Sequence, residues 1–120
     1  MVIFAEERSC TTQFELGELF YQRNNGSQQY DQALKWFKRA AINGSRQAQH
    51  RLGTMYARGH GVAQDYAKAY AWCRVAVLQN SRRARRKLGK IEARMTFRQL
   101  SLGRKLARIY YRRFVSPQVH

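Results

Sequence analysis

The residues that could carry out catalysis or hold a metal ion are few in this chain of 120 residues. His50 and His60 lie ten positions apart, which is not a spacing typical of metal ligands. Cys73 has no identifiable His or Asn partner that would activate it as a nucleophile. The seven Asp and Glu residues offer no paired carboxylates for general acid–base chemistry. We therefore predict a protein without catalytic residues, bound metal or cofactor.

Basic side chains are the distinctive chemical feature. The chain has 23 Lys and Arg against 7 Asp and Glu, a formal net charge of +16. Residues 61–120 hold fifteen of the basic residues and two acidic ones, Asp65 and Glu92. Because charges of one sign at this density repel each other, they favour an anionic partner. The residues predicted to contact it are Arg83, Arg86, Lys87, Lys90, Arg94, Arg98, Lys105, Arg108, Arg112, His50, Arg51 and Arg58.

The chain repeats with a period of 36 residues, and this repeat predicts how the basic residues are positioned. A Leu-Gly pair ends at Gly17, at Gly53 and again at Gly89. The same offset relates Trp36 to Trp72 within a shared Tyr-x-x-Ala-x-x-Trp frame. Tryptophan is rare enough that this match indicates a true repeat.

Each unit is predicted to contain two helices. In the first unit they are expected over residues 12–23 and 30–42, with a turn at 24–27. In the second unit Gly59 suits a left-handed helix cap and Gly61 a further positive φ, while Asp65 is placed to cap the next helix. Tyr56 falls on the apolar face of the helix that Gly59 ends.

The outward strip of the first helix in each unit is expected to change from acidic to mixed to basic. It comprises Thr11, Phe14, Glu15, Glu18 and Gln22, then Gln47, His50, Arg51, Thr54 and Arg58, and finally Arg83, Arg86, Lys87, Lys90 and Arg94.

Glycine inside a helix costs about 1 kcal/mol relative to alanine, so the three repeated glycines need a packing reason. We expect each of Gly17 and Gly53 to receive the large ring of the tryptophan in its own unit, Trp36 or Trp72. Such a contact would let the paired helices approach closely.

The third unit is predicted to be atypical, as a terminal repeat should be. A helix over 84–94 is followed by Thr96 and Gln99, which form a capping box for a last helix ending near Phe114. The apolar face expected for this helix comprises Leu102, Leu106, Ile109, Tyr110 and Phe114, and the basic face opposite comprises Arg98, Arg104, Lys105, Arg108 and Arg112. The domain is expected over 12–114, with repeats at 12–45, 48–81 and 84–114, after a flexible N-terminal segment, 1–11, and before a tail, 115–120.

These residues resemble the Sel-one-like repeat family, a branch of the tetratricopeptide-like helical repeats. The second unit carries the pattern at Ala48, Leu52, Gly53, Tyr56, Gly59, Gly61, Val62, Asp65, Lys68, Ala69, Trp72 and Ala76. The first unit keeps Leu16, Gly17, Ala33, Trp36, Ala40, Ala41 and Gly44. The resemblance implies an all-α, right-handed solenoid of antiparallel helix pairs, here two full repeats plus a C-terminal capping pair. It also implies a protein-binding scaffold, often in bacterial signalling, envelope or secretion assemblies.

The sequence indicates neither export nor membrane insertion. The apolar run at the start is only four residues long, and no stretch reaches the roughly 18 apolar residues of a membrane span. Cys10 and Cys73 do not form a disulfide framework, and Cys73 is expected to be a small packing residue. We therefore expect a cytoplasmic protein.

Three functions are compatible with this pattern. The first is a non-enzymatic adaptor whose basic C-terminal surface docks an acidic protein partner, with Phe14 or Tyr111 as aromatic anchors. The second is nucleic-acid binding by residues 82–113, and the third is association with an anionic membrane surface. A homodimer through Phe14, Leu19 and Phe20 is also expected to be feasible.

Overall fold

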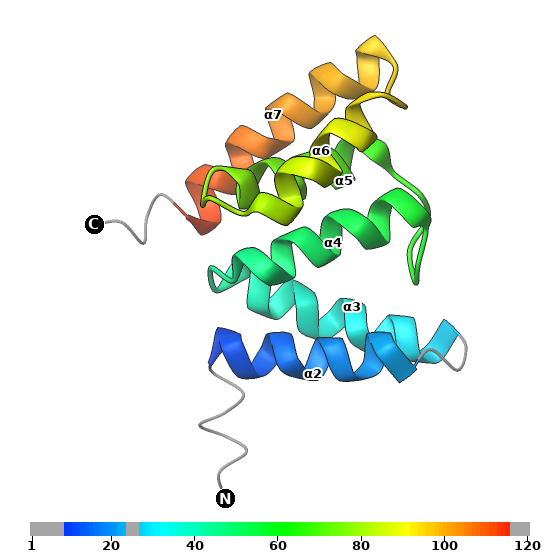
Figure 1. Cartoon of the computed structure of the whole chain (residues 1–120), viewed down its shortest axis with the longest axis vertical. Coiled ribbons are helices and arrows are strands. Elements are labelled where there is room, and N and C mark those ends of the chain that lie inside the picture. Colours follow the sequence, from blue (N-terminus) through cyan, green and yellow to red (C-terminus); the bar gives the residue numbers. More distant parts are fainter. Residues whose placement is uncertain (1–8, 24–26, 116–120) are drawn as a thin grey trace, which may run out of the picture.

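The computed structural model describes residues 9–23 and 27–115. Within these ranges the chain forms helices and no strand (Figure 1), which confirms the predicted all-α class. The helices are α2 (Cys10–Arg23), α3 (Ser27–Ile42), α4 (Arg46–Arg58), α5 (Tyr66–Val77), α6 (Arg82–Glu92) and α7 (Phe97–Phe114). The segments expected at 1–11 and 115–120, and the turn at 24–27, lie mostly outside the described residues.

Helices α4, α5, α6 and α7 each begin at a side-chain cap. Ser45, Asp65, Ser81 and Thr96 have extended backbones, and each side-chain oxygen accepts a hydrogen bond of 3.1 Å from the amide three residues later. Such a cap stabilises a helix by about 1 kcal/mol. Gln99 completes the box at Thr96 by accepting from its amide at 2.9 Å. The predicted Asp65 cap and Thr96 capping box are confirmed.

Residues with positive φ lie at or just after the ends of α3, α4 and α5. Gly59 (φ 73°) caps α4, and its amide donates to the carbonyl of Met55 at 2.7 Å. Gly61 (φ 75°) lies in the connection to α5, as the sequence predicted. Gly44 (φ 99°) and Asn80 (φ 70°) occupy equivalent places one repeat apart. Asparagine can replace glycine at this place because it tolerates a positive φ better than most residues.

The helices stack in chain order from α2 to α6, and α7 then returns to α5. Pairs α2–α3 and α4–α5 pack side by side, and α3 packs on α4 to join them (Figure 1). Helix α5 is the centre of the C-terminal half because α4, α6 and α7 all pack against it. The core therefore runs through α3, α4 and α5, and its largest fully buried side chains are Phe37, Leu52, Met55, Gln49, Val75 and Cys73.

The expected contact between each repeated glycine and a tryptophan is wrong. A Cβ on Gly17 would come within 2.5 Å of the Phe37 ring, and one on Gly53 would collide with Sγ of Cys73. Phe37 and Cys73 each follow the tryptophan by one residue. Since successive residues of an α-helix point about 100° apart, the tryptophan and the residue after it point in different directions, and the latter is the one that faces the glycine.

The two tryptophans share a position in the repeat but differ in their surroundings. Trp36 is half-buried, and the guanidinium of Arg39 lies 5.0 Å from its ring. Trp72 is only 6% exposed, because α7 covers it with Tyr110 and Phe114, at ring separations of 4.6 and 5.7 Å. The difference arises because a long helix packs over α5 but not over α3.

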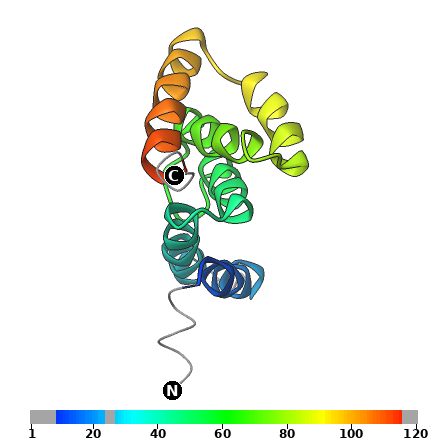
Figure 2. The ribbon, with the colours of Figure 1, turned by 90° about the vertical axis from the view of Figure 1, so that its left-hand side faces the viewer.

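The last helix packs only partly through the predicted face, of which Leu106, Tyr110 and Phe114 lie against the core as expected. Leu102 and Ile109 are 51% and 52% exposed, whereas the small residues Gly103 and Ala107 are buried. A Cβ on Gly103 would lie 2.9 Å from the ring of Tyr70, so glycine lets α7 approach α5 closely. Helices α6 and α7 consequently diverge from their connecting segment (Figure 2) and do not pack together as the helices of the first two units do.

Candidate partner-binding surface

A hollow between α4 and α6 brings together four of the predicted basic residues. Its volume is about 400 Å³, and Arg58 from the end of α4 meets Lys87, Lys90 and Arg94 from α6 and the residues after it. Tyr66 and Ile91 are among the apolar residues of its lining, and no acidic residue belongs to it. Burial and the neighbouring Arg58 lower the pKa of Lys87, which shows how closely the cations are crowded.

Arg51 differs from the expectation because its charge is already compensated. Its Nε donates to Oε1 of Glu18 at 2.5 Å and its Nη2 to Oε2 at 3.0 Å, a two-point ion pair between α4 and α2. Two more residues of the expected outward strip are turned inward. Thr54 is buried, and Phe14 packs on Phe37 at a ring separation of 5.8 Å. The strip is therefore narrower than predicted, and Phe14 is not an exposed anchor.

His50 adds no positive charge at neutral pH. Burial, followed by the nearby charges of Arg51, Lys87 and Arg83, lowers its pKa to about 4, against a small opposing effect of the Glu18 carboxylate. His50 lines a small pocket of about 170 Å³ between α2, α4 and the start of α6. It was predicted as an exposed cationic contact, and its half-buried position explains why that role does not suit it.

We expect His50 to make the fold less stable as the pH falls. Its folded pKa of about 4 is below the usual 6.5, so between these values the unfolded chain binds more protons and stability is lost on acidification. Between pH 7 and pH 4.5 the melting temperature of the native chain should fall further than that of His50→Gln, measured by circular dichroism. Parallel curves for the two proteins would contradict the shift.

The second histidine belongs to an aromatic cluster that the sequence did not reveal. The ring of His60 stacks on Tyr30 at 4.5 Å with an angle of 3°, and its Nδ1 shares a hydrogen bond of 3.1 Å with the hydroxyl of Tyr21. A Cβ on Gly61 would lie 3.0 Å from Tyr30, so the α4–α5 connection sits directly on α3. These contacts give His60 a structural role, and the 36-residue repeat did not predict it because Tyr30 and His60 lie 30 residues apart.

The side chains that could bind a metal ion or act as a nucleophile are dispersed or buried within the described residues. Among them no three His, Cys, Asp or Glu side chains are grouped so as to hold a metal ion. Cys73 is fully buried, and burial raises its pKa to about 12, so its thiol is not a nucleophile near neutral pH. It is the small packing residue that the sequence predicted.

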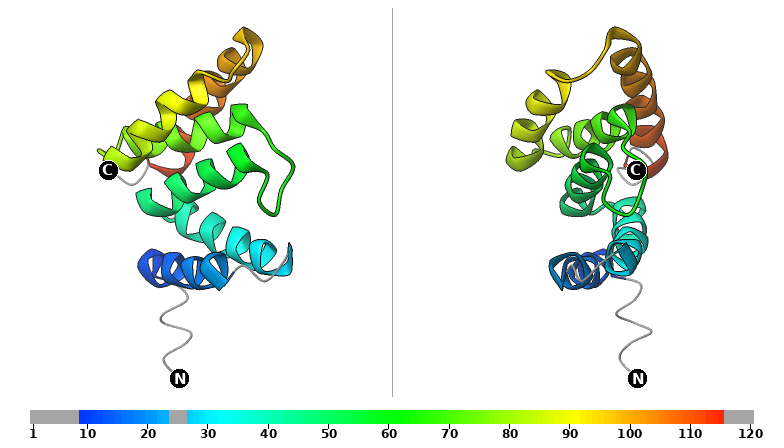
Figure 3. Two further views of the ribbon diagram at one scale, coloured as in Figure 1. Left: turned by 45° about the vertical axis from the view of Figure 1, so that its right-hand side comes forward. Right: turned by 90° about the vertical axis from the view of Figure 1, so that its right-hand side faces the viewer.

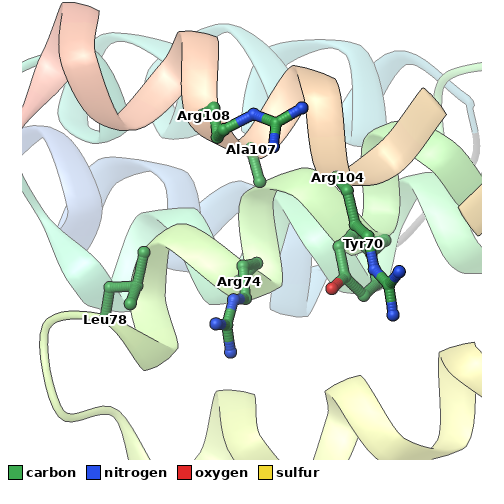
Figure 4. A pocket seen from close by; sticks show the side chains of 6 residues that line it. All are labelled: Tyr70, Arg74, Leu78, Arg104, Ala107 and Arg108. Atoms are coloured by element: carbon green, nitrogen blue, oxygen red, sulfur yellow. The ribbon is translucent and has the colours of Figure 1, made fainter. Parts of the chain in front are cut away.

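Helices α6 and α7 diverge (Figure 3), and their basic residues line different pockets. Arg86 lies with Arg82 and Arg85 around the start of α6. Arg108 instead lines a separate groove of about 320 Å³ between α5 and α7 (Figure 4). Its lining is Tyr70, Arg74, Leu78, Arg104, Ala107 and Arg108. The sequence did not predict Arg74 as a binding residue, because the α7 residues that line the groove with it are distant in the sequence.

Stacked helix pairs with this repeat define the molecule as a helical-repeat protein, an α-solenoid. The Sel1 repeat family model matches residues 12–45 and 46–81, more than half of the chain, and the chain belongs to this family. Repeats of this family generally mediate protein–protein interaction, and their proteins are typically non-enzymatic scaffolds. No curated protein sequence matches the chain. In the described residues no helix is both long and apolar enough to span a membrane.

The fold is similar to a solved structure from a bacterium. This is the crystal structure of c5321, a protective antigen present in uropathogenic Escherichia coli strains and displaying an SLR fold. The TM-score is 0.85 and the sequence identity 29%, over 95% of this chain and 24% of that chain. The present chain thus spans about a quarter of the length of that protein.

Proposed function

We propose that this chain is a non-enzymatic adaptor that docks an acidic protein partner on its basic C-terminal half, within a bacterial regulatory, signalling or secretion-related assembly. The observation that carries the proposal is the hollow between α4 and α6, where Arg58, Lys87, Lys90 and Arg94 converge beside apolar side chains. The family's general role in protein–protein interaction supports a protein as the partner.

The electrostatics of the hollow favour an anionic occupant. The only ion pair in residues 9–23 and 27–115 joins Arg51 to Glu18, so the cations of the hollow have no acidic partner within that part of the chain. Burial is the largest cause of the lowered pKa of Lys87, and carboxylates of a docked protein would offset the smaller effect of the neighbouring cations. Tyr66 and Ile91 lie beside these cations and provide the apolar contact area that stabilises an interface when water is excluded from it.

The test is affinity capture with the full chain and two charge-reversed variants. Lys90→Glu/Arg94→Glu changes two exposed cations of the hollow, and Lys35→Glu/Lys38→Glu makes the same change on exposed positions of α3. Acidic proteins held by the wild type and by the α3 variant should be lost from the Lys90/Arg94 variant. They should also elute by about 0.5 M salt, since screening is then strong.

Two results would contradict the proposal. The first is an unchanged set of captured proteins for the Lys90/Arg94 variant. The second is capture that disappears after nuclease treatment, which would assign the hollow to nucleic acid. The homodimer expected from the sequence stays a prediction and is independent of this test. Leu19 is 47% exposed and available for it, whereas Phe14 packs on Phe37.

A further inference from the structure

The third repeat is open where the first two are closed. In the first two units the repeated glycine of the first helix, Gly17 or Gly53, is covered by a residue of the second helix. At Gly89 of α6 the equivalent space is empty, since a Cβ there would meet no atom within 4 Å. Ile109 of α7, one repeat after Cys73, should cover Gly89 but is instead 52% exposed.

The open space is explained by the packing of α7. Gly103 and Ala107 place α7 against α5, and it has little direct contact with α6. A groove therefore lies between α5 and α7, on the side where Figure 2 shows α6 and α7 diverging, and Figure 4 shows the side chains that line it. Leu78 in its floor is 47% exposed, which is a large apolar side chain without a covering element.

The charge of this groove is of one sign. Arg74 of α5 and Arg104 and Arg108 of α7 contribute three guanidinium groups, and Figure 4 shows those of Arg74 and Arg104 extending to the same side. None of the three belongs to the ion pair found within the described residues. Tyr70, Leu78 and Ala107 form the apolar part of the lining.

We propose that the α5–α7 groove binds an acidic amphipathic helix of a protein partner, which occupies the place beside α6 that the second helix of the third repeat leaves open. Its apolar face would cover Tyr70 and Leu78, and its flanking carboxylates would pair with Arg74, Arg104 and Arg108. Gly89 permits the backbone of such a helix to approach α6, as glycine does at Gly53. The groove is separate from the hollow between α4 and α6, so this site adds to the proposed function.

A designed peptide of about 18 residues, five helical turns, serves as the probe. It carries Leu on one face and Glu elsewhere, and fluorescence anisotropy measures its binding to the full chain. A peptide of the same composition with Leu evenly spread is the control. The amphipathic peptide should bind at least about tenfold more tightly, because only it presents a continuous apolar face.

Two variants of α7 with equal charge changes locate the peptide. Arg104→Glu/Arg108→Glu alters the groove, whereas Arg98→Glu/Arg112→Glu alters exposed positions of the same helix outside the lining. The Arg104/Arg108 variant should weaken binding by about 30-fold or more and the Arg98/Arg112 variant by about threefold. The reason is that charges in close contact interact more strongly than distant charges screened by salt. Gly89→Phe fills the open space and should weaken binding by about tenfold with unchanged helicity.

Equal weakening by the two α7 variants would overturn the inference, because it would show attraction by net charge alone. Binding that is lost in Lys90→Glu/Arg94→Glu but kept in Arg104→Glu/Arg108→Glu would place the peptide in the α4–α6 hollow, which supports the proposed function and refutes this site. Absence of peptide binding would also refute it. The inference would also be refuted if a single-stranded oligonucleotide or anionic vesicles bound more tightly than the peptide and if that binding depended on Arg104 and Arg108.

Discussion

Replacing Gly53 with alanine should destabilise the protein by about 2 kcal/mol, although alanine is the better helix former by about 1 kcal/mol. The added Cβ would collide with Sγ of Cys73 and lie 3.1 Å from the carbonyl oxygen of Ala69. Cys73 is fully buried, so the core gives it little room to move aside. Urea denaturation followed by circular dichroism measures the free energy of unfolding.

The same substitution at the equivalent position of the third unit provides the matched control. Gly89→Ala places its Cβ in open space and should stabilise the protein by about 0.5–1 kcal/mol through helix propensity alone. In Gly53→Ala/Cys73→Ala, removal of the sulfur should restore part of the loss. Effects of the same sign and size at Gly53 and Gly89 would show that the third unit is closed like the others.

Trp72→Ala is expected to cost about 3–5 kcal/mol, the range for removing a buried aromatic ring. Trp72 lies under α7 against Tyr110 and Phe114, so its loss leaves a cavity between α5 and α7. Since domains of this size are stable by only about 5–15 kcal/mol, the variant should melt at a much lower temperature.

Trp36→Ala tests the same repeat position without a covering helix. Trp36 is half-buried, and its interaction with Arg39 is worth about 0.5–1 kcal/mol, so the total loss should be clearly smaller than for Trp72. Limited proteolysis should cut α7 sooner in Trp72→Ala than in Trp36→Ala. Equal losses of stability in the two variants would contradict the role assigned to α7.

Many residues of the candidate site could be predicted from the sequence, but their division between the α4–α6 hollow and the α5–α7 groove could not. The repeat frame predicted Lys90 and Arg94 on an exposed face of the first helix of unit three; both are exposed, Lys90 on α6 and Arg94 just after its end. It also predicted Arg51 as a partner contact, and the structure pairs it with Glu18. Ion pairs between helices depend on which side chains meet across 33 residues of chain, and no local pattern records that.

The sequence alone determined the class of the fold, the period of the repeat and several of the helix ends. These features depend on local chemistry: caps such as Asp65 and Thr96, positive-φ residues such as Gly59, and the spacing of apolar side chains. Only the tertiary structure decided where α7 lies. Gly103 lets it pack on α5 in preference to α6, and this choice between two surfaces divides the basic residues into a hollow and a groove.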